Sequence, residues 1–598
     1  MKLNNLDYTG SYIIAPVSLT ASVSDYLTES IAEYKIYISN DVQYDHMANE
    51  HGKIVIIGYC FDIRNGQKTQ NEILNSLLSS NNIIDELDYI NGRYLIIRQH
   101  GSNTELFSDA SQLQPLAYHR DSGVLASHDK LLAEFLKEND YMIKQREDKL
   151  HHTELDYTRY YEIYKMNPSL ALNLNDFEFA RIYPREPLQD NSPEESFEKM
   201  KPYLDESVKW LQNNTQEKFL TITGGIDSRV SASLTRDIPD VEYLTYLTPR
   251  KKLATSMARR IYKIDEEITR DMKRNLGWKH DIINIFDFQV SPEEYKQSLE
   301  LFNSKHSFGL RNYYENHKKY KHALHIKSTV FGMGKADFNT NLDQQEDTLE
   351  FYTKCLHGLP KERMASQNFQ TEIDKYFERN LVEAGMPMGR HYFDIFHLES
   401  RMGNWHSTLT LETDPQTDEF IFTNARKMID LIQKPSVEDR RNFKLYKCII
   451  NNYWPVLLHF GINKIKNVYE QNIENNFMFK NLNIEGSSNL LMNANDHQLA
   501  LKPKSAPIRF DELFTVKIKT NKDERFLLKS TYNNPKGQGN IRVIIRSNHT
   551  HNVYDITKLN SGLELTADTD GILIMMMYSR LFINPSWKDA GELLIEQL

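Results

Sequence analysis

The side chains best suited to chemistry lie in residues 221–229, which read Thr-Ile-Thr-Gly-Gly-Ile-Asp-Ser-Arg after the apolar pair Phe219-Leu220. A strand that ends in two glycines lets backbone N–H groups converge on an anion, and the positive end of a following helix points to the same place. Hydroxyl groups can donate to a phosphate, and a carboxylate is a hard ligand for magnesium. The pattern predicts a pyrophosphate cradle, although the Gly-Lys-Ser/Thr ending of the P-loop is absent. Its residues are Thr223, Gly224, Gly225, Asp227 and Ser228.

This stretch resembles the PP-loop of the ATP pyrophosphatases, usually Ser-Gly-Gly-x-Asp-Ser, with Thr223 in place of the first serine. The alternative is an ordinary glycine-rich turn between a strand and a helix. The resemblance implies that ATP is split between its α and β phosphates, that AMP is transferred to a substrate, and that Mg²⁺ takes part.

Later segments resemble asparagine-synthetase-like enzymes in the same order along the chain. A helix begins near Asp265-Glu266, and the family's Gly-x-Gly-x-Asp-Glu motif is similar to Gly332, Gly334 and Asp337. Asp337 stands one residue late, and no glutamate follows it. The resemblance implies that Asp227 and Asp337 bind magnesium, since two carboxylates from two strand ends suit an ion that bridges phosphates. The alternative is that Asp337 caps a helix that follows the two glycines.

The resemblance also implies catalytic roles for Glu399, Arg401 and Lys464. Glu399-Ser400-Arg401 is similar to a Glu-x-Arg on a helix beside the acceptor substrate, where the glutamate can act as a base and the arginine can support it. The alternative is an ion pair on a helix surface. A lysine of the 460–466 region contacts phosphate in amide-forming relatives. Lys464 is favoured over Lys466 because it follows the turn, and the alternative is a solvated lysine.

The first part of the chain resembles the glutamine amidotransferase domain of asparagine synthetases. The similar residues are Gly92-Arg93-Tyr94, Asp109, Pro115 to Tyr118 and Ala126-Ser127. The family's nucleophile is a cysteine at residue 2 whose own amine acts as base, whereas this chain begins Met1-Lys2-Leu3. Cys60 lies in an expected strand. We therefore expect no glutaminase activity, and the amine comes from a substrate, as in β-lactam synthetases and lasso-peptide cyclases.

The composition limits the classes of protein. With 598 residues, 40% hydrophobic and 26% charged residues, the chain is expected to hold several domains, each with its own core. A net charge of −10 argues against general nucleic-acid binding. Three widely spaced cysteines suit neither a disulfide framework nor a zinc knuckle and favour a reducing cytoplasm. No secretory h-region opens the chain, and the run 572–578 is too short to span a bilayer.

Periodicity predicts an α/β and α+β multidomain protein. Residues 1–150 read as a β-sandwich-like, amidotransferase-like domain, and 151–190 as a linker. Residues 191–475 read as a parallel α/β PP-loop domain with a helical extension; its strands are expected at 219–223, 241–247, 281–285 and 328–332. Residues 480–598 read as an antiparallel β domain, expected to cover the helical domain's surface rather than bind a glycan or carrier.

The sequence thus favours a cytoplasmic, AMP-forming ligase that uses ATP and Mg²⁺ to join a carboxylate to an amine. Both substrates are small-molecule, peptide or glycan-linked. Two alternatives remain: an ammonia-dependent asparagine synthetase, and a catalytically silent ATP-binding or scaffold protein in envelope or glycan assembly. The sequence leaves the oligomeric state open, a homo-oligomer included.

Overall fold

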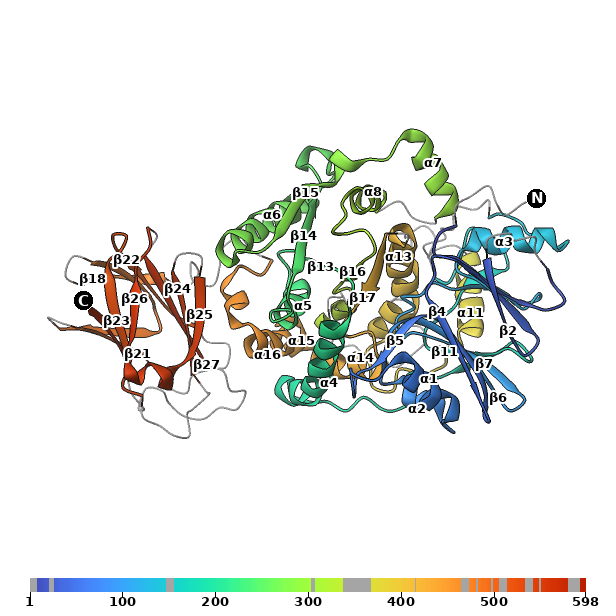
Figure 1. Ribbon diagram of the computed structural model, residues 1–598, viewed down its shortest axis with the longest axis horizontal. Helices are drawn as coiled ribbons and strands as arrows, with labels where there is room; N and C mark the ends of the chain where they lie inside the picture. The colour runs from blue at the N-terminus through green and yellow to red at the C-terminus, as the bar shows by residue number, and fades with distance from the viewer. Residues whose placement is uncertain are drawn as a thin grey trace. The chain divides into compact units, whose positions relative to one another are not determined.

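The structure is a computed structural model that describes residues 8–20, 26–146, 155–302, 307–336, 367–414, 416–463, 473–479, 482–495, 498–504, 513–532, 541–547, 550–569, 571–578 and 592–598. The described chain is mixed α/β, with several antiparallel sheets and one parallel sheet of five strands (Figure 1). It forms two compact units. Unit 1 comprises residues 1–219, 238–240 and 285–442, and unit 2 comprises 220–237, 241–284 and 443–598.

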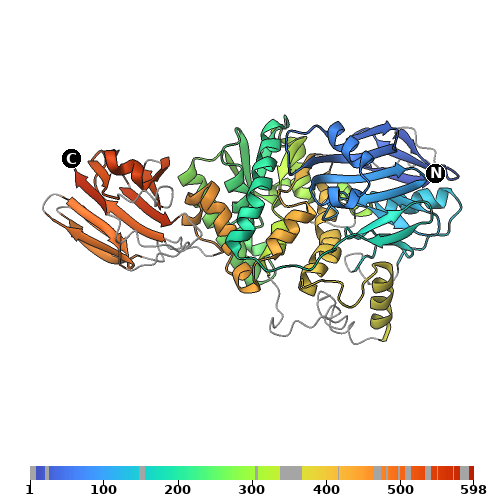
Figure 2. The ribbon, with the colours of Figure 1, turned by 90° about the horizontal axis from the view of Figure 1, so that it is seen from below.

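Two six-stranded antiparallel sheets form the N-terminal part of unit 1, in the orders β10-β8-β9-β1-β3-β2 and β12-β11-β7-β6-β5-β4. Their inner faces share one apolar core that includes Ile14, Ile36, Val55 and Leu95, so the sheets lie layered on each other (Figure 2). The strands are β1 (Tyr12–Pro16), β2 (Tyr26–Ile31), β3 (Tyr34–Ser39), β4 (Tyr44–Asn49), β5 (Gly52–Asp62), β6 (Ile90–His100), β7 (Asn103–Ser108), β8 (Ala117–His119), β9 (Val124–Ala126), β10 (Ile163–Lys165), β11 (Leu170–Asn173) and β12 (Glu178–Arg181).

Helices cover the outer faces of this sandwich. α1 (Gln70–Ser79) buries Ile73 and Leu77 in a cluster with residues of β5 and β6, and it starts at a capping box between Thr69 and Glu72. α2 (Ile83–Leu87) belongs to the same cluster. α3 (Asp129–Glu138) packs on the other sheet. The resulting order of layers is helix, sheet, sheet, helix.

The stretch 151–190, expected to be a linker, contributes three strands to these sheets. β10 pairs with β8, and β11 pairs with both β7 and β12. These strands are only three or four residues long, too short to show a clear two-residue alternation, so the sequence pattern did not reveal them.

The parallel sheet has the order β15-β14-β13-β16-β17. Its strands are β13 (Lys218–Thr221), β14 (Val241–Leu247), β15 (His280–Asn284), β16 (Ala323–Ile326) and β17 (Thr417–Phe420). The strand expected at 328–332 is wrong: the buried run Ala323–Ile326 forms the strand, and Val330–Lys335 forms the 3-10 helix η4. β17 was not predicted because it lies in a region whose neighbours are helical.

Helices fill the rest of the two units. α4 (Pro193–Asn213) begins at Ser192, whose side chain accepts a hydrogen bond from the backbone of Glu195, as its sequence predicts. The others are α5 (Asp227–Leu234), η2 (Arg250–Lys252), α6 (Ser256–Leu276), η3 (Ile285–Phe288), α7 (Pro292–Leu301), α8 (Phe308–Asn316), α11 (Gln367–Arg379), α12 (Tyr392–Phe396), the π-helix η6 (His397–His406), α13 (Ser407–Thr413), α14 (Arg426–Gln433), α15 (Val437–Arg441), α16 (Lys444–Tyr453), η7 (Pro455–His459) and η9 (Ile556–Ser561).

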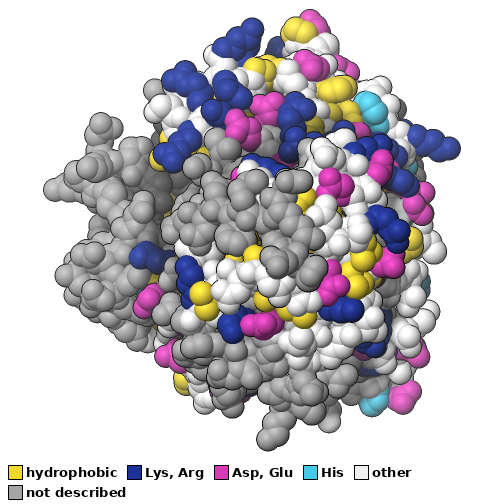
Figure 3. Space-filling view, turned by 90° about the vertical axis from the view of Figure 1, so that its left-hand side faces the viewer, with side chains coloured by type: hydrophobic (Ala, Val, Ile, Leu, Met, Phe, Trp, Pro, Cys, Tyr) yellow, Lys and Arg dark blue, Asp and Glu magenta, His cyan; other side chains and the backbone are white. Residues whose placement is uncertain are grey.

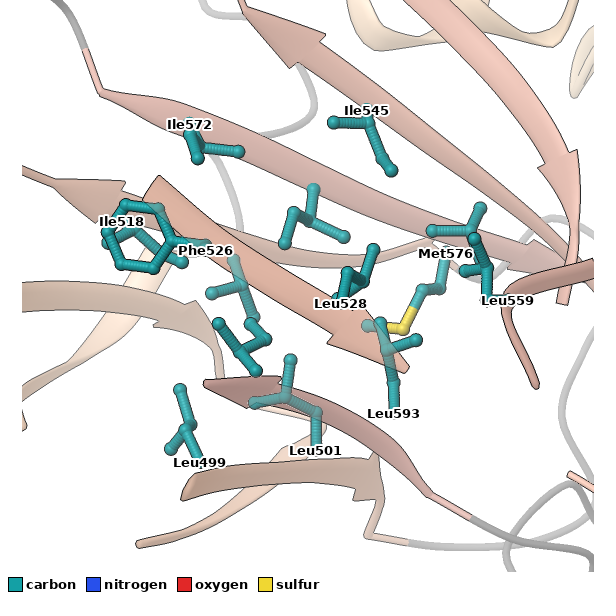
Figure 4. Close-up of a cluster of buried hydrophobic side chains, with 14 of the residues drawn as sticks. Leu499, Leu501, Ile518, Phe526, Leu528, Ile545, Leu559, Ile572, Met576 and Leu593 are labelled. Carbon is teal, nitrogen blue, oxygen red and sulfur yellow. The ribbon is translucent and has the colours of Figure 1, made fainter. Parts of the chain in front are cut away.

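The chain ends in two further antiparallel sheets, ordered β18-β19-β22-β27-β24-β25 and β20-β21-β28-β23-β26. Leu501 and Leu528 of one sheet and Ile545 and Met576 of the other point into one core (Figure 4). The strands are β18 (Ile473–Phe479), β19 (Leu482–Ser487), β20 (Leu490–Ala494), β21 (Gln498–Pro503), β22 (Leu513–Lys519), β23 (Arg525–Ser530), β24 (Ile541–Ser547), β25 (Thr550–Asp555), β26 (Leu563–Thr566), β27 (Ile572–Tyr578) and β28 (Leu593–Gln597).

The apolar alternation that predicted β structure after residue 480 lies in β22 and β24, and its side chains are the buried ones. At the edge of this region Arg542 donates hydrogen bonds to the carbonyl groups of Asn451 and Asn452, at the end of α16. Over the described residues, no helix is both long and apolar enough to cross a membrane.

Candidate functional site

The glycine loop, residues 223–228, joins the end of β13 to the start of α5. Its amide groups are bonded within the protein. The Thr223 N–H donates to Ser228 Oγ at 3.1 Å, and the Gly225 N–H donates to Thr223 Oγ1 at 3.2 Å. The Gly224 N–H donates to Asp265 Oδ1 at 2.8 Å. The two hydroxyls and the Asp265 carboxylate therefore occupy donors that a phosphate would otherwise use.

Close packing, rather than a left-handed backbone, explains the glycines. Neither Gly224 nor Gly225 has a positive φ angle. A Cβ atom on Gly224 would lie 3.0 Å from both Asp265 Oδ1 and Ile268 Cδ1, and one on Gly225 would lie 3.3 Å from Thr223 Oγ1. Any larger residue at 224 would push against α6, so the loop needs glycine there in order to pack closely against that helix.

The buried guanidinium group of Arg229 binds the backbone of the loop. Arg229 is fully buried and donates to the carbonyl oxygens of Gly224 at 3.1 Å, Leu457 at 3.2 Å and Phe460 at 2.8 Å, and also to that of Gly461. Burial lowers the pKa of Arg229 to about 9, opposed by the negative charge of Asp265. The side chain remains charged near neutral pH, so a fixed positive charge lies beneath the loop.

The turn after η7 completes this support. The Asn463 N–H donates to Gly224 O at 3.0 Å, and Asn463 adopts a left-handed backbone with φ +54°. Gly224 O thus accepts from both Asn463 and Arg229, which fixes the direction in which the peptide group points.

The start of α5 adds a positive potential on the same side of the loop. Ile226 is its N-cap residue, and no described side chain caps that end. The first N–H groups of a helix lack intrahelical partners and attract anions. Asp227 opens the helix, half-buried. Burial raises the pKa of the Asp265 carboxyl, whereas its bond from Gly224 and the charge of Arg229 lower it.

In unit 1, η4 carries Gly332 and Gly334 directly after β16. Arg440 holds this segment: its guanidinium group donates to Met333 O and pairs with Asp394, with Nη1–Oδ2 at 2.9 Å and Nη2–Oδ1 at 2.6 Å. Both partners of this ion pair are buried. Arg441 adds a bond from Nε to Ala336 O at 3.3 Å. The two arginines therefore fix the backbone that leads to residue 337.

The π-helix η6 lies against the same segment. A Cβ atom on Gly332 would meet His397 Cε1 at 3.6 Å, and His406 Nδ1 lies 3.0 Å from the hydroxyl of Thr329. Burial, with the positive charge of Arg401, lowers the pKa of His397 to about 3. Both imidazoles are therefore neutral at neutral pH, since burial also holds the pKa of His406 well below its usual value.

The structure places Glu399 and Arg401 in different surroundings. Glu399 is buried and pairs with Arg181 of β12, and Asn167 Nδ2 donates to Glu399 Oε2 at 3.0 Å. Arg401 is exposed, with its guanidinium carbon 5.9 Å from the ring centroid of Trp405. The two side chains thus do not support each other. The alternative to a catalytic role was an ion pair on a helix surface; Glu399 is in an ion pair, but a buried one with Arg181.

Three features of the predicted site lie outside the described residues. Asp337 follows η4, Lys464 follows the turn at Asn463, and Met1-Lys2 opens the chain. Cys60 is described and buried in β5, and burial raises the pKa of its thiol far above the usual value. Such a thiol is a poor nucleophile.

Asp109 organises a turn in the N-terminal part of unit 1. Its carboxylate accepts N–H bonds from Ser111, Leu113 and Gln114 at 3.2, 2.8 and 2.8 Å, and Asn424 Nδ2 donates to it at 3.0 Å. Desolvation raises the pKa of this fully buried carboxyl despite those bonds. The contacts assign Asp109 to the folding of the turn 109–114.

Sequence reasoning missed four residues that shape these two regions, namely Arg229, Asp265 as a partner of Gly224, His397 and Arg440. Arg229 stands directly after Asp-Ser in the loop motif, but the pattern did not indicate that it is buried. Nothing in the local pattern pointed to His397 or Arg440, whose partners are distant along the chain. Among the described residues there is no cluster of three or more His, Cys, Asp or Glu side chains that could hold a metal ion.

Comparison with known proteins adds no identification. No family model and no curated protein matches the chain. One similar solved structure is the glutamine phosphoribosylpyrophosphate amidotransferase of B. subtilis in complex with ADP and GMP. It is 9% identical, with a TM-score of 0.19, over 55% of this chain and 71% of that one. A likeness at this level does not bear on the activity of this chain.

Proposed function

We propose that this chain is an ATP-dependent amide-bond synthetase. It activates a substrate carboxylate as an acyl-adenylate, releases pyrophosphate and takes its amine from a second substrate rather than from glutamine. The observation that supports this most is the loop 223–228, held from beneath by the buried charge of Arg229 and followed by a helix start that no described side chain caps. That arrangement favours a polyanion.

In the first step a carboxylate oxygen of the substrate attacks the α-phosphorus of ATP, and the bond to the β-phosphate oxygen breaks. The leaving pyrophosphate accepts hydrogen bonds from the first N–H groups of α5 and from the hydroxyls of Thr223 and Ser228. The positive field of Arg229 and of the helix end lowers the energy of the charge that develops there.

Asp227 would hold Mg²⁺, with Asp337 as the second predicted ligand. The ion would neutralise part of the charge on the phosphates. The residues fit such an ion in part, because Asp227 stands beside the anion-binding helix end and magnesium needs only one or two protein carboxylates when phosphates supply the rest.

In the second step the amine attacks the acyl carbon, AMP leaves, and the amine loses a proton to a base. We predict that Glu399 is that base and that Arg401 supports it. The ion pair between Glu399 and Arg181 would have to open before Glu399 could accept the proton. Holding the acyl-adenylate and the amine next to each other would make this step effectively unimolecular.

The silent ATP-binding protein is the second candidate, and one observation favours it. Glu399, the predicted base, is buried and paired with Arg181, so it is not free to take a proton from an amine. The two candidates differ in pyrophosphate release. With ATP, Mg²⁺ and a panel of carboxylic acids and amines, the synthetase releases pyrophosphate with at least one acid. The silent protein binds ATP and releases none. Formation of asparagine from aspartate and free ammonia would identify the third candidate.

A further inference from the structure

The first residues of α6, 256–264, bury no side chain in unit 2. The buried residues of this helix are Ile268, Thr269, Met272 and Asn275, all in its C-terminal half. The other half, 256–267, has no buried residue, although the Thr255 side chain caps it by accepting from the Ala258 N–H at 3.1 Å. This end of the helix therefore presents its side chains to the surroundings of the chain.

That face is strongly basic. Residues 248–264 contain six Lys or Arg and no Asp or Glu, in a chain whose net charge is −10. The six are Arg250, Lys251, Lys252, Arg259, Arg260 and Lys263, and all are exposed. Glu266 and Glu267 pair with two of them, Arg250 and Lys263, at 3.3 and 3.7 Å. Arg259 and Arg260 form no ion pair with any residue that the structure describes, so their charge remains available to a partner.

Large apolar side chains stand among these charges. Met257 is 66% exposed and Ile261 is 49% exposed, and their spacing of four residues puts them on one face of the helix. Tyr246, at the end of β14, is 39% exposed. Figure 3 shows Lys and Arg side chains gathered in the upper part of one face of the molecule, with hydrophobic side chains among them.

We propose that residues 246–263 form a docking surface for an anionic lipid bilayer. Basic side chains attract the negative headgroups, and Met257 and Ile261 enter the boundary between headgroups and acyl chains while the helix lies in the membrane plane. A soluble polyanion would satisfy the six charges but would gain nothing from exposed methionine and isoleucine. The lipid surface uses both features, which is why we favour it. The proposal does not depend on the ATP chemistry.

Co-sedimentation of the full chain with vesicles tests the proposal. The vesicles contain phosphatidylglycerol mixed with phosphatidylcholine, or phosphatidylcholine alone. We expect binding to the anionic vesicles only. The triple variant Lys251→Gln, Arg259→Gln, Arg260→Gln should weaken that binding on the order of a hundredfold, because each basic residue near an anionic surface contributes about fivefold.

A control variant removes the same charge elsewhere. Lys318, Lys321 and Lys522 are exposed lysines outside the surface, and their replacement by Gln should leave vesicle binding unchanged. The double variant Met257→Gln, Ile261→Gln should lose the binding that persists at high salt, since that part is apolar. Thermal unfolding of each variant shows whether it is folded.

Three results would overturn the proposal. One is the absence of any preference for anionic vesicles. Another is an equal loss of binding in the two charge variants. The third is binding to heparin as strong as to vesicles with no effect of the Met257 and Ile261 changes, which would assign the surface to a soluble polyanion.

Discussion

At the scale of single residues, Arg229 links the loop to its surroundings. A buried charge without a paired carboxylate is costly, and here the cost is offset by bonds to four carbonyl oxygens. The same bonds turn the peptide at Gly224 and leave a positive charge beneath the loop. Arg229 therefore stabilises the fold of unit 2 and, in the function that we propose, adds to the attraction for the phosphates of ATP.

Replacing Arg229 by Met should destabilise unit 2 by about 3 kcal/mol, because carbonyl groups that accept from the guanidinium would stay buried without donors. ATP binding should fall as well. Urea unfolding and equilibrium binding of ATP measure the two effects. Arg236→Met is the matched control, since Arg236 is exposed one turn beyond the end of α5. A similar loss in both variants would remove the special role of Arg229.

His128 gives a prediction about pH. It is buried, and desolvation lowers its pKa from 6.5 to about 4. Between those values the unfolded chain binds more protons than the folded one, so stability falls as the pH drops from about 6.5 to about 4. The contribution is on the order of 3 kcal/mol. Urea unfolding near neutral pH and near pH 4 should show a smaller difference for His128→Gln than for the natural chain. An identical difference would contradict this.

At the scale of elements, β13, α5 and α6 form the loop's frame. The glycine pair, the strand before it and the helix after it could be read from the sequence, because they follow local rules of alternation and helix periodicity. The packing of α6 on Gly224 could not, because Asp265 lies on a different element and its position depends on the order of strands in the sheet. The strand 328–332 was misplaced for a similar reason: an apolar run beside glycines fits a strand and a 3-10 turn equally well.

Replacing Asp265 tests whether a phosphate binds at the loop, because this residue of α6 occupies the Gly224 N–H. Asp265→Asn keeps an oxygen that can accept from the Gly224 N–H and removes a negative charge beside the loop. If a phosphate binds there, the affinity for ATP should rise about tenfold, since one unfavourable charge contact is lost. Isothermal titration of ATP into both proteins measures this. Asp271→Asn, further along the same helix, is the control. Unchanged or weaker affinity would show that no phosphate approaches Gly224.

At the scale of the whole molecule, the sequence predicted the types of secondary structure in each region better than the residues at which the regions begin and end. Alternating apolar residues located β22 and β24, and the Ser192-Pro193 start located α4, because these signals are local. The described part of 151–190 instead joins the N-terminal sheets, and pairing between distant short strands leaves no local pattern. Of the candidate site, the sequence identified the loop itself but not the buried ion pairs that hold Glu399 and the η4 backbone.

The N-terminal part of unit 1 carries a prediction about glutamine. The described Cys60 is buried there, and burial raises the pKa of its thiol far above the usual value. Incubation with glutamine should therefore yield no glutamate above a protein-free blank, measured by a coupled glutamate dehydrogenase assay. Cys60→Ala should match the natural chain. Glutamate production that Cys60→Ala abolishes would show that this domain retains its hydrolytic chemistry.

The most direct test of the proposed function is the release of pyrophosphate from ATP by the natural chain and by Asp227→Asn, with Mg²⁺ and a panel of carboxylic acids and amines. Our account predicts release with at least one acid, accompanied by AMP in equal amount, and a loss of at least a hundredfold in the variant, whose thermal unfolding should match that of the natural chain. ATP binding without release over the whole panel, or equal release by both proteins, would contradict it.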